Sequence, residues 1–261
     1  MLVAHLVRGA KAGVVAGLVF GLFVALVGTP LVGVAEELGH GDHHAGGGAH
    51  EGDGHEHAAS AVSAATTTAA SVAGGVLWGL LLGVVAFGGA FYLLEPAIPG
   101  TGGARSYVLG AAGFVTVSGA PWLVLPPTPP GVEAALSVET RLGVYAATML
   151  AGALACALAV VGYRRGRAAA SRPVGALAAS VPLLVLATVG VIAPVPTAPA
   201  AASAALPDGL AAGYVGAVAF GQLVLWLVLA ATHAHLQPAP GGATNTPGLG
   251  DDHAPAAASA D

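Results

Sequence analysis

The side chains that could bind a metal ion are concentrated between Glu36 and His57, a stretch called here the His-rich segment. It holds six of the ten histidines and six of the thirteen acidic residues of the chain. Imidazole suits cobalt, nickel, copper and zinc, and carboxylates add negative charge and oxygen ligands. The segment is therefore predicted to bind a divalent transition metal. The predicted ligands are His40, His43, His44, His50, His55 and His57, together with Asp42, Glu51, Asp53 and Glu56.

The spacing of these ligands predicts adaptable binding rather than one rigid cage. The histidines follow H-x2-H-H, then wider gaps, then H-x-H, which matches no fixed zinc-finger pattern. Six glycines are interleaved with them, so the backbone can present several interchangeable ligand sets. The alternative is a polar loop that only separates two helices. Such a loop would also draw on Lys, Ser, Asn or Gln, and none of these occurs in the His-rich segment, which favours metal binding.

A second, smaller candidate is the pair His233 and His235, which stands as H-x-H after the last apolar run. These residues would receive a metal ion at the cytoplasmic end of that run. The alternative is a pair of interfacial histidines without a ligand role. His5 and His253 are isolated in the sequence and predict no function.

The composition places the chain in a membrane. Of its 261 residues, 56% are hydrophobic and 8% are charged, with a mean hydropathy of +0.80. A soluble domain carries about 25% charged residues, so this chain cannot cover a water-facing surface and is expected to contact lipid. Eight basic residues without a basic aromatic platform disfavour nucleic-acid binding. The single cysteine, Cys156, cannot form an intrachain disulfide.

Six apolar runs are long enough to cross the bilayer, which takes about 20 residues in a helix. Their apolar residues are continuous rather than alternating, which predicts helices instead of barrel strands. The runs cover residues 12–34, 72–94, 106–125, 142–162, 174–195 and 210–232. The first could also be a secretory signal, but it is longer than a usual signal core and carries a glycine stripe. The predicted fold class is therefore all-α, a polytopic helical membrane protein with about six transmembrane helices.

Small residues recur at every fourth position in four of these runs. Residues four apart share a helix face, and small ones allow a neighbouring backbone to approach closely. We therefore expect a tightly packed bundle rich in Gly and Ala. The stripes are Gly9, Gly13, Gly17, Gly21 and Ala25; Gly75, Gly79 and Gly83; Gly143, Ala147, Ala151, Ala155 and Ala159; and Gly209, Gly213, Ala217 and Gly221.

The basic residues predict the orientation in the plasma membrane. With six spans, seven of the eight fall on one side, which the positive-inside rule makes cytoplasmic, and only Arg141 falls opposite. The first helix then occupies residues 1–35 and starts in the cytoplasm. Residues 36–71 form an extracytoplasmic loop, of which Ala58 to Ser71 is helical or disordered. A five-helix remainder covers 72–232, and 233–261 is a disordered cytoplasmic tail.

The spans themselves offer little chemistry. None holds a charged residue near its centre, where an ion would need polar partners. Thr148, Gly152 and Cys156 share one helix face that could line a metal path, although ordinary packing or back-bonding is favoured. Pro121 and Pro182 interrupt the third and fifth runs, as in transporters whose broken helices line a site, but simple kinks are commoner.

No Walker loop, H-E-x-x-H motif or Ser-His-Asp set occurs, so the chain is not expected to be an enzyme.

The stretch from Pro121 to Tyr145 carries a distinctive block, PPTPPGV at 126–132, followed after a short spacer by Thr140, Arg141 and Tyr145. It resembles the signature of the predicted cobalt transporter subunit CbtA family. The Gly-rich first helices and the segment from Gln222 to Trp226 are similar as well, so the resemblance covers most of residues 8–232. It implies an inner-membrane subunit for cobalt uptake linked to cobalamin synthesis. The implied partner is CbtB, a small single-span protein with histidines of its own.

The sequence therefore predicts a membrane subunit for uptake of a divalent metal, with Co2+ as cargo from the resemblance and Ni2+ or Zn2+ as alternatives. A different class of function is a non-transporting membrane metal sensor or assembly factor. In that case the Arg164–Arg172 connection would contact a partner protein. A structural membrane protein without any metal role is the third alternative.

Overall fold

The computed structural model describes residues 1–40, 56–128, 136–192 and 208–237, and these residues contain no strand. In these ranges six helical stretches are long and apolar enough to cross a membrane, which confirms all six predicted runs and the all-α fold class. The stretches are Leu2–Val34, Ala64–Leu94, Ala104–Val124, Val138–Ala169, Arg172–Ile192 and Gly209–His235. Of the two states left open for residues 58–71, the structure shows the helix.

Three of these stretches contain a π-helical turn (η) between α-helical parts. The first consists of α1 (Leu2–Phe23), η1 (Val24–Gly28) and α2 (Thr29–His40). The second consists of α3 (Glu56–Leu82), η3 (Gly83–Ala90) and α4 (Phe91–Leu94). The third consists of α5 (Ala104–Phe114), η4 (Val115–Gly119) and α6 (Ala120–Val124). The others are α7 (Val138–Ala169), α8 (Arg172–Ile192) and α10 (Asp208–His235).

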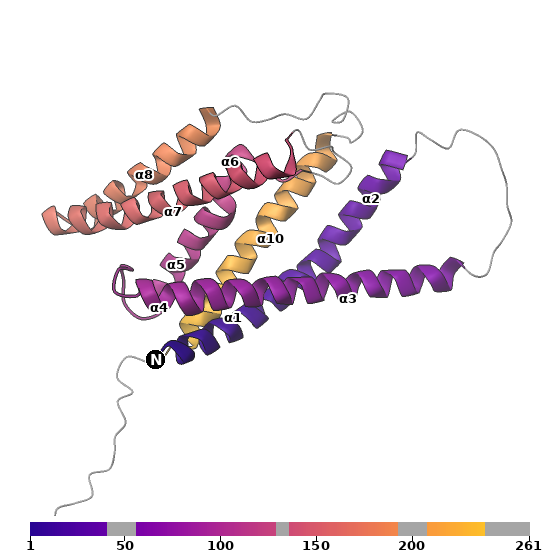
Figure 1. Ribbon diagram of the computed structural model, residues 1–261, viewed down its shortest axis with the longest axis horizontal. Helices are drawn as coiled ribbons and strands as arrows, with labels where there is room; N and C mark the ends of the chain where they lie inside the picture. Colours follow the sequence, from indigo (N-terminus) through magenta and orange to yellow (C-terminus); the bar gives the residue numbers. More distant parts are fainter. Residues whose placement is uncertain (41–55, 129–135, 193–207, 238–261) are drawn as a thin grey trace, which may run out of the picture.

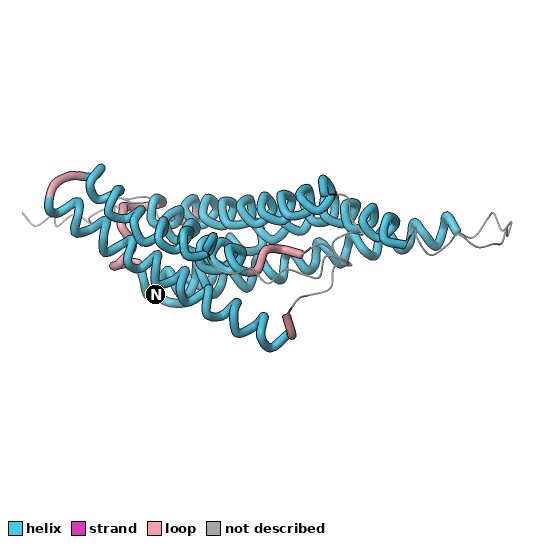
Figure 2. Tube along the Cα trace, turned by 90° about the horizontal axis from the view of Figure 1, so that it is seen from above, coloured by secondary structure: helices cyan, strands magenta, loops and turns pink. Residues whose placement is uncertain are grey.

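The helices pack in an order that differs from their order in the chain. Helix α3 packs on α1, α1 on α10, and α10 on α5. Helix α7 then packs on η4 and α6, and α8 packs on α7. In Figure 1, α5 and α10 lie between the α7–α8 pair on one side and α1 with α3 on the other, and Figure 2 shows the elongated shape. The sixth span is therefore inserted between the first and the third.

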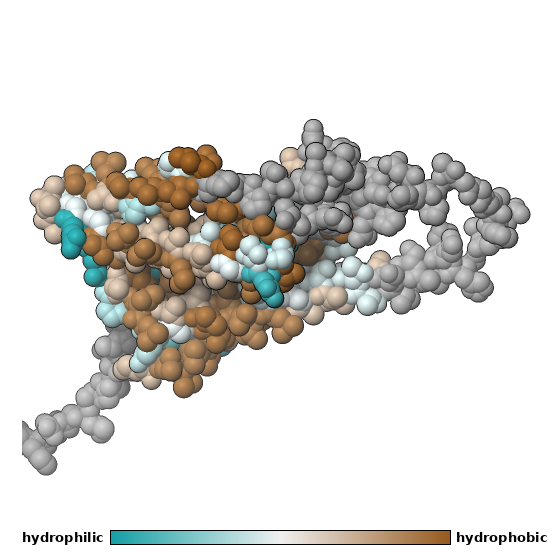
Figure 3. All heavy atoms as spheres, turned by 45° about the horizontal axis from the view of Figure 1, so that its top comes forward, coloured by the Kyte–Doolittle hydropathy of each residue, from teal (hydrophilic) through white to brown (hydrophobic). Residues whose placement is uncertain are grey.

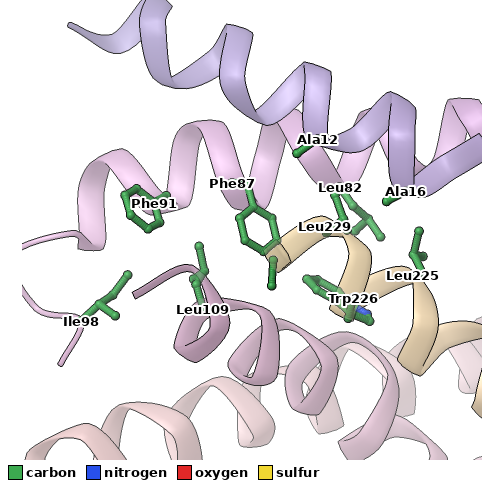
Figure 4. Close-up of a cluster of buried hydrophobic side chains, with 11 residues drawn as sticks. Ala12, Ala16, Leu82, Phe87, Phe91, Ile98, Leu109, Leu225, Trp226 and Leu229 are labelled. Atoms are coloured by element: carbon green, nitrogen blue, oxygen red, sulfur yellow. The ribbon is translucent and has the colours of Figure 1, made fainter. Parts of the chain in front are cut away.

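The largest buried cluster joins α1, η3, α5 and α10. Phe87, Leu225 and Leu229 are fully buried, and the rings of Phe87 and Trp226 lie 6.5 Å apart. Figure 4 shows Phe87 of η3, Leu109 of α5 and Trp226 of α10 pointing toward one another. This cluster holds four of the spans together, whereas α7 and α8 contribute nothing to it.

The interface between α1 and α3 is built from facing glycines. A Cβ atom placed on Gly17 would lie 2.5 Å from the carbonyl oxygen of Gly75, and Gly9 and Gly13 face Gly83 and Gly79 in the same way. Real side chains cannot approach backbone this closely, so only glycine permits the observed separation. The stripe predictions for the first and second spans are confirmed.

The stripe predictions for the fourth and sixth spans are confirmed only in part: Ala155 is buried, and a Cβ atom on Gly221 would lie 2.7 Å from the ring of Phe23. Cβ atoms placed on Gly143, Gly209 and Gly213 would contact nothing within 4 Å among the described residues. Helix α7 instead packs through Gly152 and Gly162, whose Cβ atoms would lie 2.9 Å from Ala120 Cβ and 2.8 Å from Ala178 O. A four-residue step drifts by about 40° around a helix, so a long stripe stays in an interface only where the partner helix crosses along it. The direction in which a partner helix crosses cannot be predicted from the sequence of one span.

The outer surface is apolar over most of its described area. Brown, hydrophobic atoms dominate Figure 3, and the hydrophilic atoms gather in small patches. Large side chains such as Leu142, Leu177 and Leu184 are exposed on α7 and α8. In water such a surface would aggregate, whereas in a bilayer it meets acyl chains. The chain is therefore a multi-pass membrane protein.

The glycine interface is testable by adding one methyl group. We expect Gly75→Ala to lower the free energy of unfolding by roughly 1–3 kcal/mol, the usual cost of overpacking. The added Cβ would lie 2.6 Å from the amide nitrogen of Gly21. The neighbouring Gly74→Ala is the matched control, since its Cβ would meet nothing within 4 Å. Thermal or denaturant unfolding of both purified variants in detergent measures the difference, and equal stabilities would contradict this role of Gly75.

Candidate functional site

The His-rich segment connects the end of α2 to the start of α3. Helix α2 ends at His40 and α3 begins at Glu56, so His40, Glu56 and His57 belong to helices. The other predicted ligands lie outside the described residues: His43, His44, His50, His55, Asp42, Glu51 and Asp53. The part of the chain that the structure describes contains no group of three or more His, Cys, Asp or Glu side chains that could hold a metal ion. The ligand set therefore stays a prediction.

At one end of the bundle, polar side chains from three spans meet. The Glu95 carboxylate, just after α4, lies 3.1 Å from Arg105 Nη1 of α5 and 3.8 Å from His5 Nε2 of α1. From α7, Arg164 donates to the carbonyl oxygen of Pro96 over 2.8 Å. The start of α1, the α4–α5 connection and the end of α7 therefore share one end of the protein, as the orientation prediction requires. Which side of the membrane this end faces stays a prediction.

His233 lies at the same end but is fully buried. Its ring packs against the rings of Phe87 and Phe91, with centroid distances of 5.1 and 4.7 Å. Its Nδ1 lies 2.9 Å from Ser106 Oγ, which also accepts a hydrogen bond from Gln237 Nε2 over 3.0 Å. Its Nε2 is buried and has no hydrogen-bond partner among the described residues.

The hydrogen bond to Ser106 determines what His233 can do chemically. If Nδ1 carries the hydrogen and donates it to Ser106, the buried Nε2 keeps a free lone pair, which is the arrangement of a metal-ligating histidine. If Ser106 donates to Nδ1, Nε2 carries the hydrogen and cannot ligate. His235 is exposed and lies two residues further on, about 200° around the helix. The structure therefore does not bring His233 and His235 together.

The interior of the bundle contains a line of polar groups on α10. At about 100° per residue, Gln222, Trp226 and His233 lie within about 40° of one another on one face of α10. Gln222 Oε1 accepts from Ser118 of η4 over 3.4 Å. The indole nitrogen of Trp226 is buried without a partner among the described residues. The contact between α10 and the third span thus gathers several polar groups in a largely apolar bundle.

Helix α7 contacts the third and fifth spans at the carbonyl groups that their prolines leave without a donor. Pro121 has no amide hydrogen to donate to the carbonyl of Val117, four residues earlier, and the Tyr145 hydroxyl donates to that oxygen over 2.5 Å. Pro182 likewise leaves the carbonyl of Ala178 without its usual donor, and that oxygen faces Gly162. Both proline breaks are therefore supported by a neighbouring helix, and Pro182 also lines an apolar pocket of about 540 Å3 between α7 and α8.

Other polar groups of α7 make structural contacts. The Thr148 hydroxyl donates to carbonyls of its own helix, and Cys156 Sγ lies 3.8 Å from the carbonyl oxygen of Ala112. These contacts agree with packing and back-bonding, the favoured interpretation of this face.

Several polar contacts were not predictable from the sequence. Ser106, Gln237 and the His5–Glu95 pair were not singled out, because a serine or a glutamine at a span end carries no distinguishing pattern. Ser106 and His233 are separated by 127 positions in the chain, and no local periodicity connects them. Tyr145 was singled out as part of the family resemblance, and its hydrogen bond to Val117 gives it a structural role.

The fold and the apolar surface define the chain as a polytopic helical membrane protein. Residues 3–237 match the model of a family described as "Probable cobalt transporter subunit (CbtA)". The match covers most of the chain, so this chain belongs to that family, and the resemblance inferred from the proline-rich block is confirmed. No curated protein and no solved structure matched in the other two comparisons. A family of transporter subunits indicates a metal-ion cargo.

The hydrogen bond of Tyr145 is testable by removing one oxygen. We expect Tyr145→Phe to lower the free energy of unfolding by roughly 0.5–1.5 kcal/mol, because the Val117 carbonyl freed by Pro121 loses this hydrogen bond. Tyr107→Phe is the control, since its hydroxyl makes no hydrogen bond to the described residues and its side chain is exposed. Unfolding of both variants in the same detergent measures the effect. Equal loss in both, or none in Tyr145→Phe, would contradict this role.

Proposed function

We propose that this chain is a membrane subunit of a cobalt uptake system whose His-rich segment captures the ion outside the cell. Membership of the cobalt transporter subunit family supports the cargo. The concentration of six histidines and six acidic residues between the first two spans is the single observation that carries the capture role.

The capture step depends on simple coordination chemistry. Neutral imidazoles and carboxylates form the ligand set, and glycines between them allow the segment to exchange one set for another. Such sites bind Ni2+ and Zn2+ at least as strongly as Co2+, so the ligands alone do not select cobalt. Selection for cobalt then depends on the family's transport step rather than on the His-rich segment.

The orientation of the chain in the membrane follows from the basic residues. Arg105 and Arg164 lie at the same end of the bundle as the start of α1, and the positive-inside rule makes this end cytoplasmic. The His-rich segment joins the opposite ends of the first two spans and is then extracytoplasmic. Both chain termini are cytoplasmic in this arrangement.

The path through the bundle follows the polar face of α10. An ion in the bilayer needs polar partners at depth, and the described spans provide Ser118 with Gln222 and, nearer the end of α10, His233 with Ser106. His233 ligates in the tautomer that donates to Ser106, and His235 receives the ion at the exposed end of α10. A small single-span subunit with its own histidines, similar to CbtB, is the proposed partner.

Removing the imidazoles of the His-rich segment tests the capture role. We expect replacement of His40, His43, His44, His50, His55 and His57 by Gln to lower initial cobalt uptake several-fold when Co2+ is limiting. Excess Co2+ should restore uptake, because the scaffold is unchanged and only local concentration of the ion is lost. His253→Gln is the control. Radioactive cobalt uptake by cells that also express the partner subunit measures both.

Two other results have distinct meanings. Unchanged uptake by the six-histidine variant at limiting Co2+ would contradict capture while leaving transport intact. Equal cobalt accumulation with and without the chain would contradict transport and favour the metal sensor or assembly factor.

The orientation is testable by labelling single cysteines. In a Cys156→Ser background, we expect a membrane-impermeant maleimide to label His44→Cys on intact cells. Ala168→Cys, at the end of α7 that carries the arginines, should react only after permeabilisation. The reverse pattern would place the His-rich segment in the cytoplasm and overturn the capture role.

A further inference from the structure

Two adjoining pockets of different chemistry lie where α5, α7 and α8 meet the α4–α5 connection. The first has a volume of about 430 Å3 and is lined by Arg105, Arg164 and Arg167. The second has a volume of about 460 Å3 and is almost entirely apolar. The two share the lining residues Pro99, Gly100 and Tyr163, so they adjoin, and together they are called here the groove.

The first pocket has an excess of positive charge. Arg105 is held by Glu95 at 3.1 Å and by the carbonyl oxygen of Gly100 at 3.1 Å, so its charge is partly neutralised. Arg164 is fixed by a hydrogen bond of 2.8 Å to the carbonyl of Pro96. Among the described residues, neither Arg164 nor Arg167 forms an ion pair. Three guanidinium groups therefore surround this pocket with one carboxylate beside them, which favours an anion.

The second pocket extends from the arginines toward the middle of the bundle. Small side chains, including Ala112, Cys156 and Ala159, leave the space open between α5, α7 and α8. The helical stretches that contain α5 and α7 are both long and apolar enough to cross a membrane, so a ligand that enters between the arginines and continues along them runs beside apolar, membrane-spanning helices. An acyl chain fits this groove by polarity, and a free phosphate or nucleotide would leave it empty.

We propose that this groove binds one anionic phospholipid, with the phosphate at Arg164 and Arg167 and an acyl chain along α5 and α7. Basic pockets between transmembrane helices recognise lipid headgroups through the same pairing of guanidinium and phosphate. The lipid would join the α7–α8 pair to the rest of the bundle, because α7 and α8 contribute nothing to the main buried cluster. The proposal does not depend on transport or on the His-rich segment.

Native mass spectrometry of the purified full chain in neutral detergent tests this site. We expect dioleoyl phosphatidylglycerol to bind about tenfold or more tightly than dioleoyl phosphatidylcholine, which has the same chains but a zwitterionic headgroup. The double variant Arg164→Gln with Arg167→Gln should reduce phosphatidylglycerol binding to the phosphatidylcholine level. The matched control, Arg165→Gln with Arg172→Gln, removes the same charge from the same connection at positions that do not line the pocket.

A second pair of variants tests the apolar groove. Ala159→Phe fills the groove and should weaken phosphatidylglycerol binding, whereas Ala157→Phe, on the exposed face of α7, should not. Equal binding of the two lipids by the unmodified chain would overturn the proposal. So would equal losses in the two arginine variants, which would indicate general surface attraction. Competition by millimolar inorganic phosphate with no effect of Ala159→Phe would indicate a free-anion site instead.

Discussion

Hydrocarbon offers no hydrogen-bond partner, and much of this structure follows from the need to satisfy backbone groups inside the chain. Helices do this for themselves except where a proline removes an amide. Both helices that contain such a proline pack against α7. The Tyr145 hydroxyl of α7 donates to the freed carbonyl of Val117, and Gly162 of α7 faces the freed carbonyl of Ala178. The long α7 thereby acts as a support for the third and fifth spans.

A second constraint is how closely helices can approach. Without a hydrophobic driving force between helices in lipid, association depends on van der Waals contact and on a few polar contacts. The glycines of α1 and α3 bring two backbones together, and the aromatic cluster around Phe87 fills the wider space toward α5 and α10. Glycines between α1 and α3 and aromatic rings toward α5 and α10 thus give four spans one common core. The α7–α8 pair packs outside this core.

The proposed function divides the work between two regions of different physical character. The His-rich segment has ligands in excess and a glycine-rich backbone, which suits collection of an ion but not choice among similar ions. The bundle has few polar groups, and these are held at defined places by Ser106, Ser118 and the aromatic rings around His233. The bundle is better suited than the His-rich segment to distinguish cobalt from similar ions, because its polar groups are held in a restricted geometry.

The sequence by itself determined the membrane location, the number of spans and the family. Continuous apolar runs of sufficient length need no tertiary information to be recognised, and the proline-rich block is local in the chain. The glycine stripes of the first two spans were also readable, because glycines four residues apart form a ridge that a crossing helix can follow. The high density of histidines in the His-rich segment was equally recognisable from the sequence, although their role as metal ligands is still a prediction.

Only the tertiary structure decided which faces are used. It placed the sixth span between the first and third, and it paired Ser106 with His233 and Tyr145 with Val117. It also left open space at Gly209 and Gly213, where an added Cβ atom would meet no described residue within 4 Å. The physical reason is that a helix repeats its pattern whatever lies beside it. Its neighbours depend on chain connections and crossing angles, which no periodicity within a single span contains.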